Sequence, residues 1–231
     1  MIEASWRNVG RTSAWACGGL VIVGGALVTT VSVGIPPTEP DLAKHYSYIR
    51  EIWPALYISF LLFMVAFLSL APLGLVLREF FGRTLRSELL YASFFAAALL
   101  GVIWMLAQAG SAQAAARDSA GLSTPDLNVL GASSSIWSGV INWLQRGFLL
   151  FASLGVYWTG RIGLGQRSMP RGLAWVSVVM AGLSWLGLAT LILRDLGILL
   201  PEAVGSFILA LVARMALVWA GWLGLALGRP T

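Results

Sequence analysis

Charged side chains are scarce in this sequence. They make up 11% of the 231 residues, whereas hydrophobic residues make up 58%, and the mean hydropathy is +0.82. A soluble domain carries about 25% charged residues, so a soluble fold of this length would lack the polar surface that covers a core. The apolar residues also come in blocks of about 20, the length that crosses the hydrocarbon core of a bilayer. The sequence therefore predicts an all-α integral membrane protein, with residues 1–231 as a single transmembrane domain.

Residues that bind metals or cofactors are almost absent. The chain has one cysteine (Cys17), one histidine (His45) and one lysine (Lys44). A lone cysteine excludes disulfides within the chain and multi-cysteine metal sites. Because His45 and Lys44 fall outside the hydrophobic blocks, we expect neither axially ligated haem nor a retinal Schiff base there. We expect no metal, no cofactor and no catalytic residue, and thus a non-catalytic protein.

The basic residues do not form a nucleic-acid-binding patch. The formal charge is +5, but the arginines are distributed over several short segments between the hydrophobic blocks. Phosphate binding needs a clustered basic face or run. We therefore expect membrane lipid as a partner, together with other membrane subunits or further copies of the chain, and no nucleic acid.

Hydropathy predicts six transmembrane helices. The first block is longer than the apolar core of a signal peptide and lacks a small-residue cleavage site, so it is interpreted as a retained helix. Pro36, Pro37 and Pro40 prevent that helix from continuing. The two longer connections, 35–52 and 110–136, are predicted as outer loops. The second is rich in Ala, Ser and Gly and is expected to extend the third helix before a break at Gly121 to Pro125. The expected spans are residues 13–34, 53–77, 89–109, 137–159, 173–193 and 204–227.

The distribution of arginine predicts the orientation of these spans. Nine basic residues fall in the N-terminal tail, 78–88, 160–172 and the C-terminal tail, against four in the opposite connections. Segments richer in basic residues stay on the cytoplasmic side. We therefore expect both termini in the cytoplasm of a multi-pass protein, most simply in a bacterial cytoplasmic (inner) membrane.

Two arginines fall inside predicted spans. Arg146 and Arg214 each lie about 13–15 Å from the outer end of their helix at 1.5 Å per residue. A charge at the bilayer centre is costly, so each should face protein, a cavity or an anion. One interpretation is that they satisfy helix carbonyls or pair with Gln108, Asn142 or Asp195. The other is an anion or lipid-headgroup site shared by both side chains, with the candidate residues Arg146, Arg214, Asn142, Gln108 and Ser206.

Small residues recur at helical spacing on the first and last spans. They are typical of helices whose backbones approach closely in lipid, either within the bundle or against a partner. The residues predicted for such an interface are Gly24, Gly25, Ala220, Gly224 and Gly228.

A short stretch carries a resemblance to other membrane proteins. It reads Arg167-Ser168-Met169-Pro170-Arg171-Gly172-Leu173-Ala174 and continues as Ala181-Gly182-Leu183-Ser184-Trp185-Leu186-Gly187. This resembles the fourth-to-fifth connection of a bacterial group of six-helix membrane proteins known as a domain of unknown function. The resemblance covers some 20 residues around Arg167–Gly187 and implies a six-helix fold without implying an activity.

Several functions fit these features. The first is an accessory subunit of a membrane complex, or a protein that binds lipid or another apolar ligand. The alternative is a small transporter or channel-like protein for an anionic or amphipathic solute, which the two deep arginines would recognise. An intramembrane enzyme acting through Asp195 and Glu202, and a membrane sensor, stay open as well.

Overall fold

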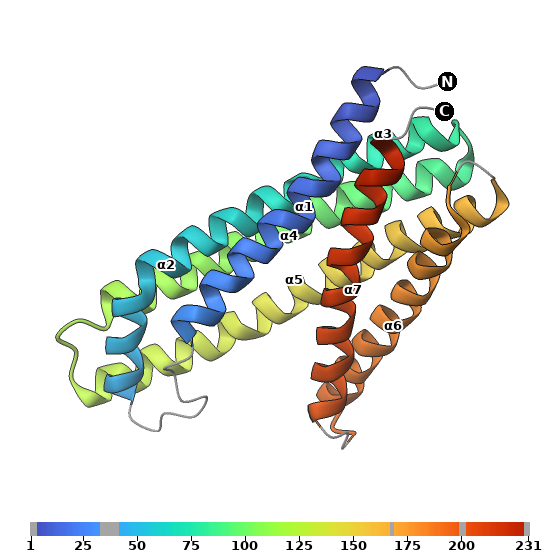
Figure 1. The fold of residues 1–231 in the computed structure, drawn as a ribbon. Coiled ribbons are helices and arrows are strands. Elements are labelled where there is room, and N and C mark those ends of the chain that lie inside the picture. The colour runs from blue at the N-terminus through green and yellow to red at the C-terminus, as the bar shows by residue number, and fades with distance from the viewer. Residues whose placement is uncertain (1–3, 33–41, 167–168, 199–201, 229–231) are drawn as a thin grey trace.

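The computed structural model describes residues 4–32, 42–166, 169–198 and 202–228 (Figure 1). Within these ranges all the regular structure is α-helical. The helices are α1 (Ala4–Ser32), α2 (Leu42–Leu68), α3 (Leu70–Phe81), α4 (Leu85–Asp118), α5 (Thr124–Gly165), α6 (Arg171–Asp195) and α7 (Glu202–Gly228).

Helices α2 and α3 form one path with an interruption near its middle. Ser69 separates them, and its amide still donates to the carbonyl of Val65 at 3.1 Å. Pro72 has no amide hydrogen to donate four residues back to Leu68, and a proline ring crowds that carbonyl. The regular helix is therefore interrupted at Ser69, and α3 continues from the end of α2.

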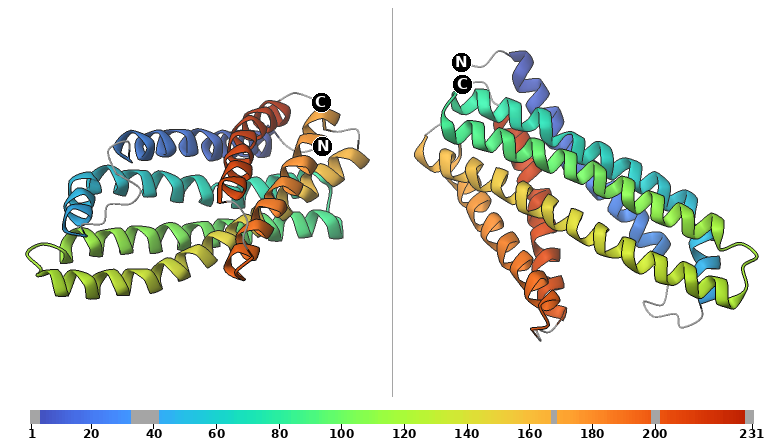
Figure 2. Two further views of the ribbon diagram at one scale, coloured as in Figure 1. Left: turned by 90° about the horizontal axis from the view of Figure 1, so that it is seen from below. Right: turned by 180° about the vertical axis from the view of Figure 1, so that it is seen from behind.

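The helices form an elongated bundle with one divergent arm. In Figures 1 and 2, α1, α2, α4 and α5 run alongside one another, and α6 and α7 diverge from them as a hairpin. Within the described residues the α7 backbone lies close to α1 and α6 but not to α5, and the ring of Trp219 on α7 contacts that of Phe94 on α4. The first turns of α1 and the last turn of α7 lie at the same end: a Cβ added to Gly228 would be 3.1 Å from Cδ of Arg11.

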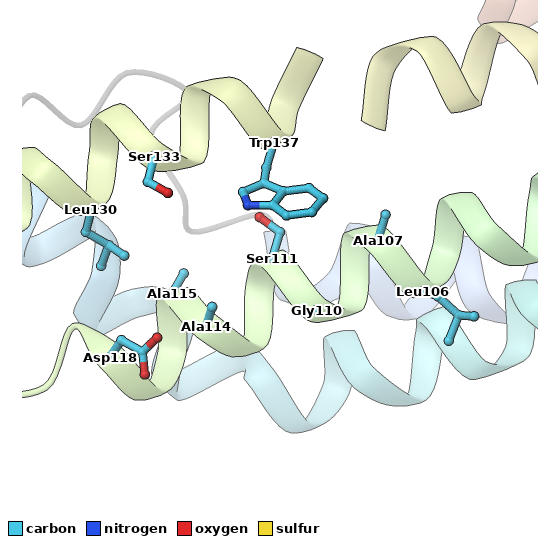
Figure 3. Close-up of a pocket in the computed structure, with 10 residues that line it drawn as sticks. All are labelled: Leu106, Ala107, Gly110, Ser111, Ala114, Ala115, Asp118, Leu130, Ser133 and Trp137. Carbon is cyan, nitrogen blue, oxygen red and sulfur yellow. The ribbon is translucent and has the colours of Figure 1, made fainter. Parts of the chain in front are cut away.

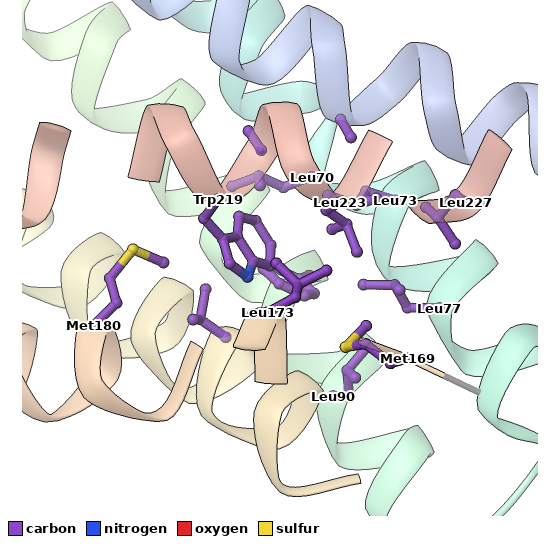
Figure 4. Close-up of a cluster of buried hydrophobic side chains, with 14 of the residues drawn as sticks. Leu70, Leu73, Leu77, Leu90, Met169, Leu173, Met180, Trp219, Leu223 and Leu227 are labelled. Atoms are coloured by element: carbon purple, nitrogen blue, oxygen red, sulfur yellow. The ribbon is translucent and has the colours of Figure 1, made fainter. Parts of the chain in front are cut away.

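The hydrophobic core lies where the arm joins the bundle (Figure 4). Its fully buried side chains include Phe94, which occupies space left by two glycines on neighbouring helices. A Cβ added to Gly74 on α3 or Gly155 on α5 would come within 2.9 Å of Phe94. The other large members of this core are Leu73, Leu77, Leu90, Leu173, Trp219 and Leu223.

Both predicted outer loops are largely helical: helix over 42–52 and 124–136 was not expected, whereas the expected extension of the third helix into 110–136, with a break near Gly121, is confirmed. Residues 42–52 belong to α2, 110–118 to α4 and 124–136 to α5, so only 119–123 interrupt the helices of the second connection. Gly121 has a φ of +77° there, a conformation that glycine adopts readily. Polar Ser and Gln lowered the hydropathy of 110–136, but alanine-rich sequence keeps a high helix propensity. Residues 35–41 lie outside the described residues.

Five helical stretches in the described chain are long and apolar enough to cross a membrane. They are Ser5–Thr30, Lys44–Phe81, Leu85–Asp118, Arg171–Asp195 and Phe207–Gly228. Their length and composition indicate a multi-pass membrane protein, as the sequence predicted. The predicted span 137–159 is not among them: it is the middle of α5, whose 42 residues extend over about 63 Å.

Candidate functional site

The small residues predicted as an interface on α7 pack against α1 of the same chain. A Cβ added to Gly18 on α1 would lie 3.1 Å from Cβ of Ala220, and one added to Gly224 would overlap the indole of Trp15. Gly228 faces Arg11, as described above. On α1, a Cβ added to Gly24 would lie 3.3 Å from the ring of Phe63 on α2, whereas one added to Gly25 would meet nothing within 4 Å. This stripe on α7 therefore serves the contact between the first and last helices.

A cavity of about 320 Å³ lies between the divergent arm and the rest of the bundle. All seven helices contribute to its wall, because α6 and α7 separate from α1 and α5 just beyond the core. Phe67, Leu70 and Phe94 from α2, α3 and α4 line it together with α1 residues Cys17, Gly18 and Val21. The remaining wall comes from α5 (Gln145, Phe148, Leu149, Ala152, Ser153, Val156), α6 (Met180, Ser184) and α7 (Leu209, Val212, Ala213, Ala216, Leu217, Trp219, Ala220).

The wall of this central cavity is apolar and uncharged. None of its described lining residues is Asp, Glu, Lys or Arg. Its two serine hydroxyls are satisfied within their own helices: Ser153 donates to Leu150 O and Ser184 to Met180 O, each at 2.8 Å. The indole of Trp219 donates to Ser177 Oγ, also at 2.8 Å. With these groups satisfied, the cavity suits an apolar ligand better than water, which needs two to four polar partners.

Arg146 lies on α5 beside the end of α6. It is 8% exposed and forms an ion pair with Asp195, the last residue of α6, whose side chain is 44% exposed. Its guanidinium carbon also lies 4.8 Å from the ring centroid of Trp143, a cation–π contact. Of the two interpretations of this arginine, pairing with Asp195 matches the geometry. In this ion pair Asp195 neutralises the positive charge of Arg146 to which an anion would otherwise bind.

Arg214 lies elsewhere, on the outward surface of α7. Its side chain is exposed, and the buried residues of this helix (Val212, Trp219, Ala220, Leu223) lie on the opposite face. The expectation that Arg146 and Arg214 both face the interior and line one cleft is therefore wrong for Arg214. The reason is the helical register of α7, whose small and large apolar residues, not its charge, pack against α1 and α6.

The other candidates for an anion site are dispersed. Gln108 on α4 is half-buried and Asn142 on α5 is exposed. The side chain of Ser206 lies outside the described residues. The described geometry thus brings Arg146 and Asp195 together but does not bring Arg214 to them.

A second cavity, of about 480 Å³, lies between the C-terminal part of α4 and the N-terminal part of α5 (Figure 3). The indole of Trp137 lies over α4 near Ser111 and Gly110 in that view, with Asp118 toward the α4–α5 turn. Trp137 is 54% exposed and Asp118 is exposed as well, so this is a surface groove.

Sequence reasoning missed the central cavity. Its residues come from seven helices and are mostly leucine, alanine, valine and phenylalanine, which are common in any membrane helix. Only the pairing of the helices shows that they surround one space. Among the described residues, no three His, Cys, Asp or Glu side chains gather as a metal site.

Comparison with models of known protein families, with curated proteins and with solved structures finds no match. The assignment of a function therefore depends on the central cavity and on the two arginines.

Proposed function

We propose that this protein is a non-catalytic membrane protein that holds the hydrocarbon chain of a lipid, or a similar apolar molecule, in the central cavity. The observation that carries the proposal is the wall itself: apolar, uncharged and contributed by all seven helices. Ligand pockets are typically about 300–1,000 Å³ and mainly apolar, with a few polar groups that orient the ligand. Gln145 is the one side-chain amide of this wall and lies on the turn of α5 next to Arg146.

The arrangement of helix ends supports six crossings. The start of α1 and the end of α7 meet at one end of the bundle, where Gly228 lies beside Arg11. An even number of crossings is needed to return the chain to its starting side. Counting α2 and α3 as one path, α1, α2–α3, α4, α5, α6 and α7 make six. The α5 helix would cross as part of the bundle, covered by α4 and α6 on either side.

The proposed orientation keeps the arginine-rich end in the cytoplasm. That end carries Arg7, Arg78 and Arg171, among the nine basic residues on this side of the chain. In this frame α6 crosses from Arg171 to Asp195. Asp195 and its partner Arg146 then lie near the outer boundary, and the central cavity lies about halfway across.

Transport of an anion is the weaker alternative. It requires positive charge along a shared path, but Arg146 is paired with Asp195 and the described cavity wall is uncharged. A role as a subunit of a membrane complex is compatible with the cavity.

A cavity-filling substitution tests the proposal. The purified protein is loaded with a photoactivatable fatty acid, cross-linked and digested, and the modified residues are identified by mass spectrometry. We expect labels on wall residues such as Leu149 and Met180. Ala216→Phe, which fills the cavity, should remove these labels.

Ala189→Phe is the matched control, because Ala189 is exposed on α6 and makes no part of the wall. It should leave the labelling unchanged. Labels confined to outward-facing residues, or the same labels in Ala216→Phe, would contradict a ligand in the cavity.

A further inference from the structure

The outward face of α7 carries a continuous stripe that nothing in the described chain covers. Within the described residues α7 lies against α1 and α6, and its Trp219 also contacts Phe94 on α4, all on its other faces. The stripe is spaced alternately by four and three residues, the spacing of a seam between two helices. Its members are Phe207, Leu211, Arg214, Val218, Gly221 and Leu225.

This stripe, called here the Arg214 stripe, is apolar except for one charge. Phe207, Val218 and Leu225 are 70%, 66% and 58% exposed. A Cβ added to Gly221 would meet nothing within 4 Å, so the backbone is open to close approach at that point. Arg214 therefore stands alone among apolar neighbours on a face that a second helix could pack against.

The contacts between α6 and α7 fix the depth of Arg214. Toward one end, a Cβ added to Gly187 on α6 would lie 2.9 Å from Cδ2 of Leu209. Toward the other, Trp219 donates to Ser177 on α6. Arg214 lies between these two levels, about midway along the membrane-spanning hairpin. This depth of Arg214 rests on the proposed membrane arrangement and does not depend on a ligand in the cavity.

An unpaired guanidinium at this depth is costly in hydrocarbon. Within the described residues no side chain forms an ion pair or a hydrogen bond with Arg214. A carboxylate is the natural complement, because it accepts two parallel hydrogen bonds from the planar fork of arginine.

We propose that the Arg214 stripe binds a transmembrane helix of another protein, one that carries an Asp or Glu near the bilayer centre. A second copy of this chain is a poor occupant, because a two-fold contact through the stripe would place Arg214 against Arg214. The described carboxylates of a second copy also lie toward helix ends, as Asp195 and Glu79 do. Such a pairing makes the protein a subunit of a larger membrane assembly.

The test uses a designed helix as the probe. The full chain, with a donor fluorophore on its C-terminal tail, is reconstituted in phosphatidylcholine vesicles. The probe is a leucine-rich transmembrane peptide with one central Glu and an acceptor dye; matched peptides carry Gln or Leu there. We expect the Glu peptide to associate about tenfold more tightly than the Leu peptide.

Variants separate the charge from the apolar surface. Arg214→Leu should abolish the preference for Glu, and Arg214→Glu should instead prefer a peptide with a central Lys. Val218→Ala, which keeps the charge on the same stripe, is the control and should retain the preference. The Tm and the size-exclusion elution of each variant in detergent, compared with those of the unmodified chain, check that it is folded.

Three results would overturn the proposal. The first is equal association of the Glu and Leu peptides with the unmodified chain. The second is enrichment of anionic phosphatidylglycerol around the protein that depends on Arg214 and displaces the Glu peptide, which would assign the arginine to a lipid headgroup. The third is self-association that Arg214→Leu does not change and that excludes the peptide. None of these bears on whether the cavity holds an apolar ligand.

Discussion

The indole nitrogen of Trp219 on α7 donates a hydrogen bond of 2.8 Å to the hydroxyl of Ser177 on α6, and both residues are buried. The same hydroxyl donates to Leu173 O at 2.8 Å, so Ser177 accepts one bond and donates another. Apart from this bond, the described contacts between these two helices are mainly van der Waals. The bond fixes the register of the arm next to the cavity wall.

Removing the acceptor should destabilise the arm. Ser177→Ala leaves the buried indole N–H without a partner, which costs about 1–3 kcal/mol. Thermal unfolding in detergent should show a lower Tm. Ser184→Ala is the matched control on the same helix, because its hydroxyl bonds only to Met180 O within its own turn.

A double-mutant cycle with Trp219→Phe then isolates the pair. The Tm loss caused by Ser177→Ala is measured once in the unmodified chain and once in a chain that already carries Trp219→Phe. If the two losses are equal, the bond contributes nothing specific.

The sequence predicts the helices of this protein better than their ends. Five of the six predicted apolar blocks fall in helical stretches long and apolar enough to cross a membrane, because about 20 apolar residues are needed for that. The alanine-rich composition of 110–136 predicted that α4 continues beyond its apolar centre. Hydropathy did not reveal the helix over 42–52 or the start of α5 at Thr124, since alanine and serine lower the hydropathy without ending a helix. Hydropathy indicates the environment of a segment, whereas helix ends depend on caps and glycines such as Gly121.

The candidate site was only partly predictable. Arg146 and Arg214 stand out in sequence for one reason, a charge within an apolar block, but they differ in the structure. Arg146 reaches Asp195 because α5 and α6 pack antiparallel, and Arg214 points outward because of its place on α7. The central cavity has no sequence signal, because its shape arises from the divergence of α6 and α7.

The Arg146–Asp195 pair should couple α5 to the end of α6. Asp195→Asn leaves the buried guanidinium without its counter-charge and should lower the Tm more than the double variant Arg146→Leu/Asp195→Asn does. The loss should be smaller than the about 3–5 kcal/mol typical of breaking a fully buried pair, because the Asp195 side chain is half-exposed. Arg171→Gln is the control, since Arg171 is an exposed arginine at the other end of the same helix. Equal Tm values for Asp195→Asn and the double variant would show that no charge is left uncompensated.

Close packing of α1 on α7 should make Gly224 intolerant of a methyl group. Gly224→Ala places a Cβ into the indole of Trp15, and such overpacking costs about 1–3 kcal/mol. Gly25→Ala is the matched control on α1, where an added Cβ meets open space and alanine gains up to about 1 kcal/mol in helix propensity. The Tm should fall in the first variant and hold or rise in the second. A combined Gly224→Ala/Trp15→Ala variant with the same Tm as Gly224→Ala alone would show that the indole is not what the methyl group meets.

The side of the membrane on which the chain ends decides between six crossings and five. With N-terminal Arg7 and Arg11 inside, both counts place Ser123, in the α4–α5 turn, outside. They differ after α5: if α5 crosses, the C-terminus returns to the cytoplasm, and if α5 stays on the outer surface, the C-terminus lies outside.

Single cysteines at Ser123 and Thr231, in a Cys17→Ala background, should therefore behave differently toward a membrane-impermeant maleimide applied to intact cells. We expect labelling at 123 alone, with 231 labelled only after the membrane is permeabilised. The physical reason is that nine basic residues would otherwise be divided between the two sides, against the tendency of arginine-rich segments to stay inside. Labelling of 231 in intact cells would favour five crossings and would remove α5 from the membrane.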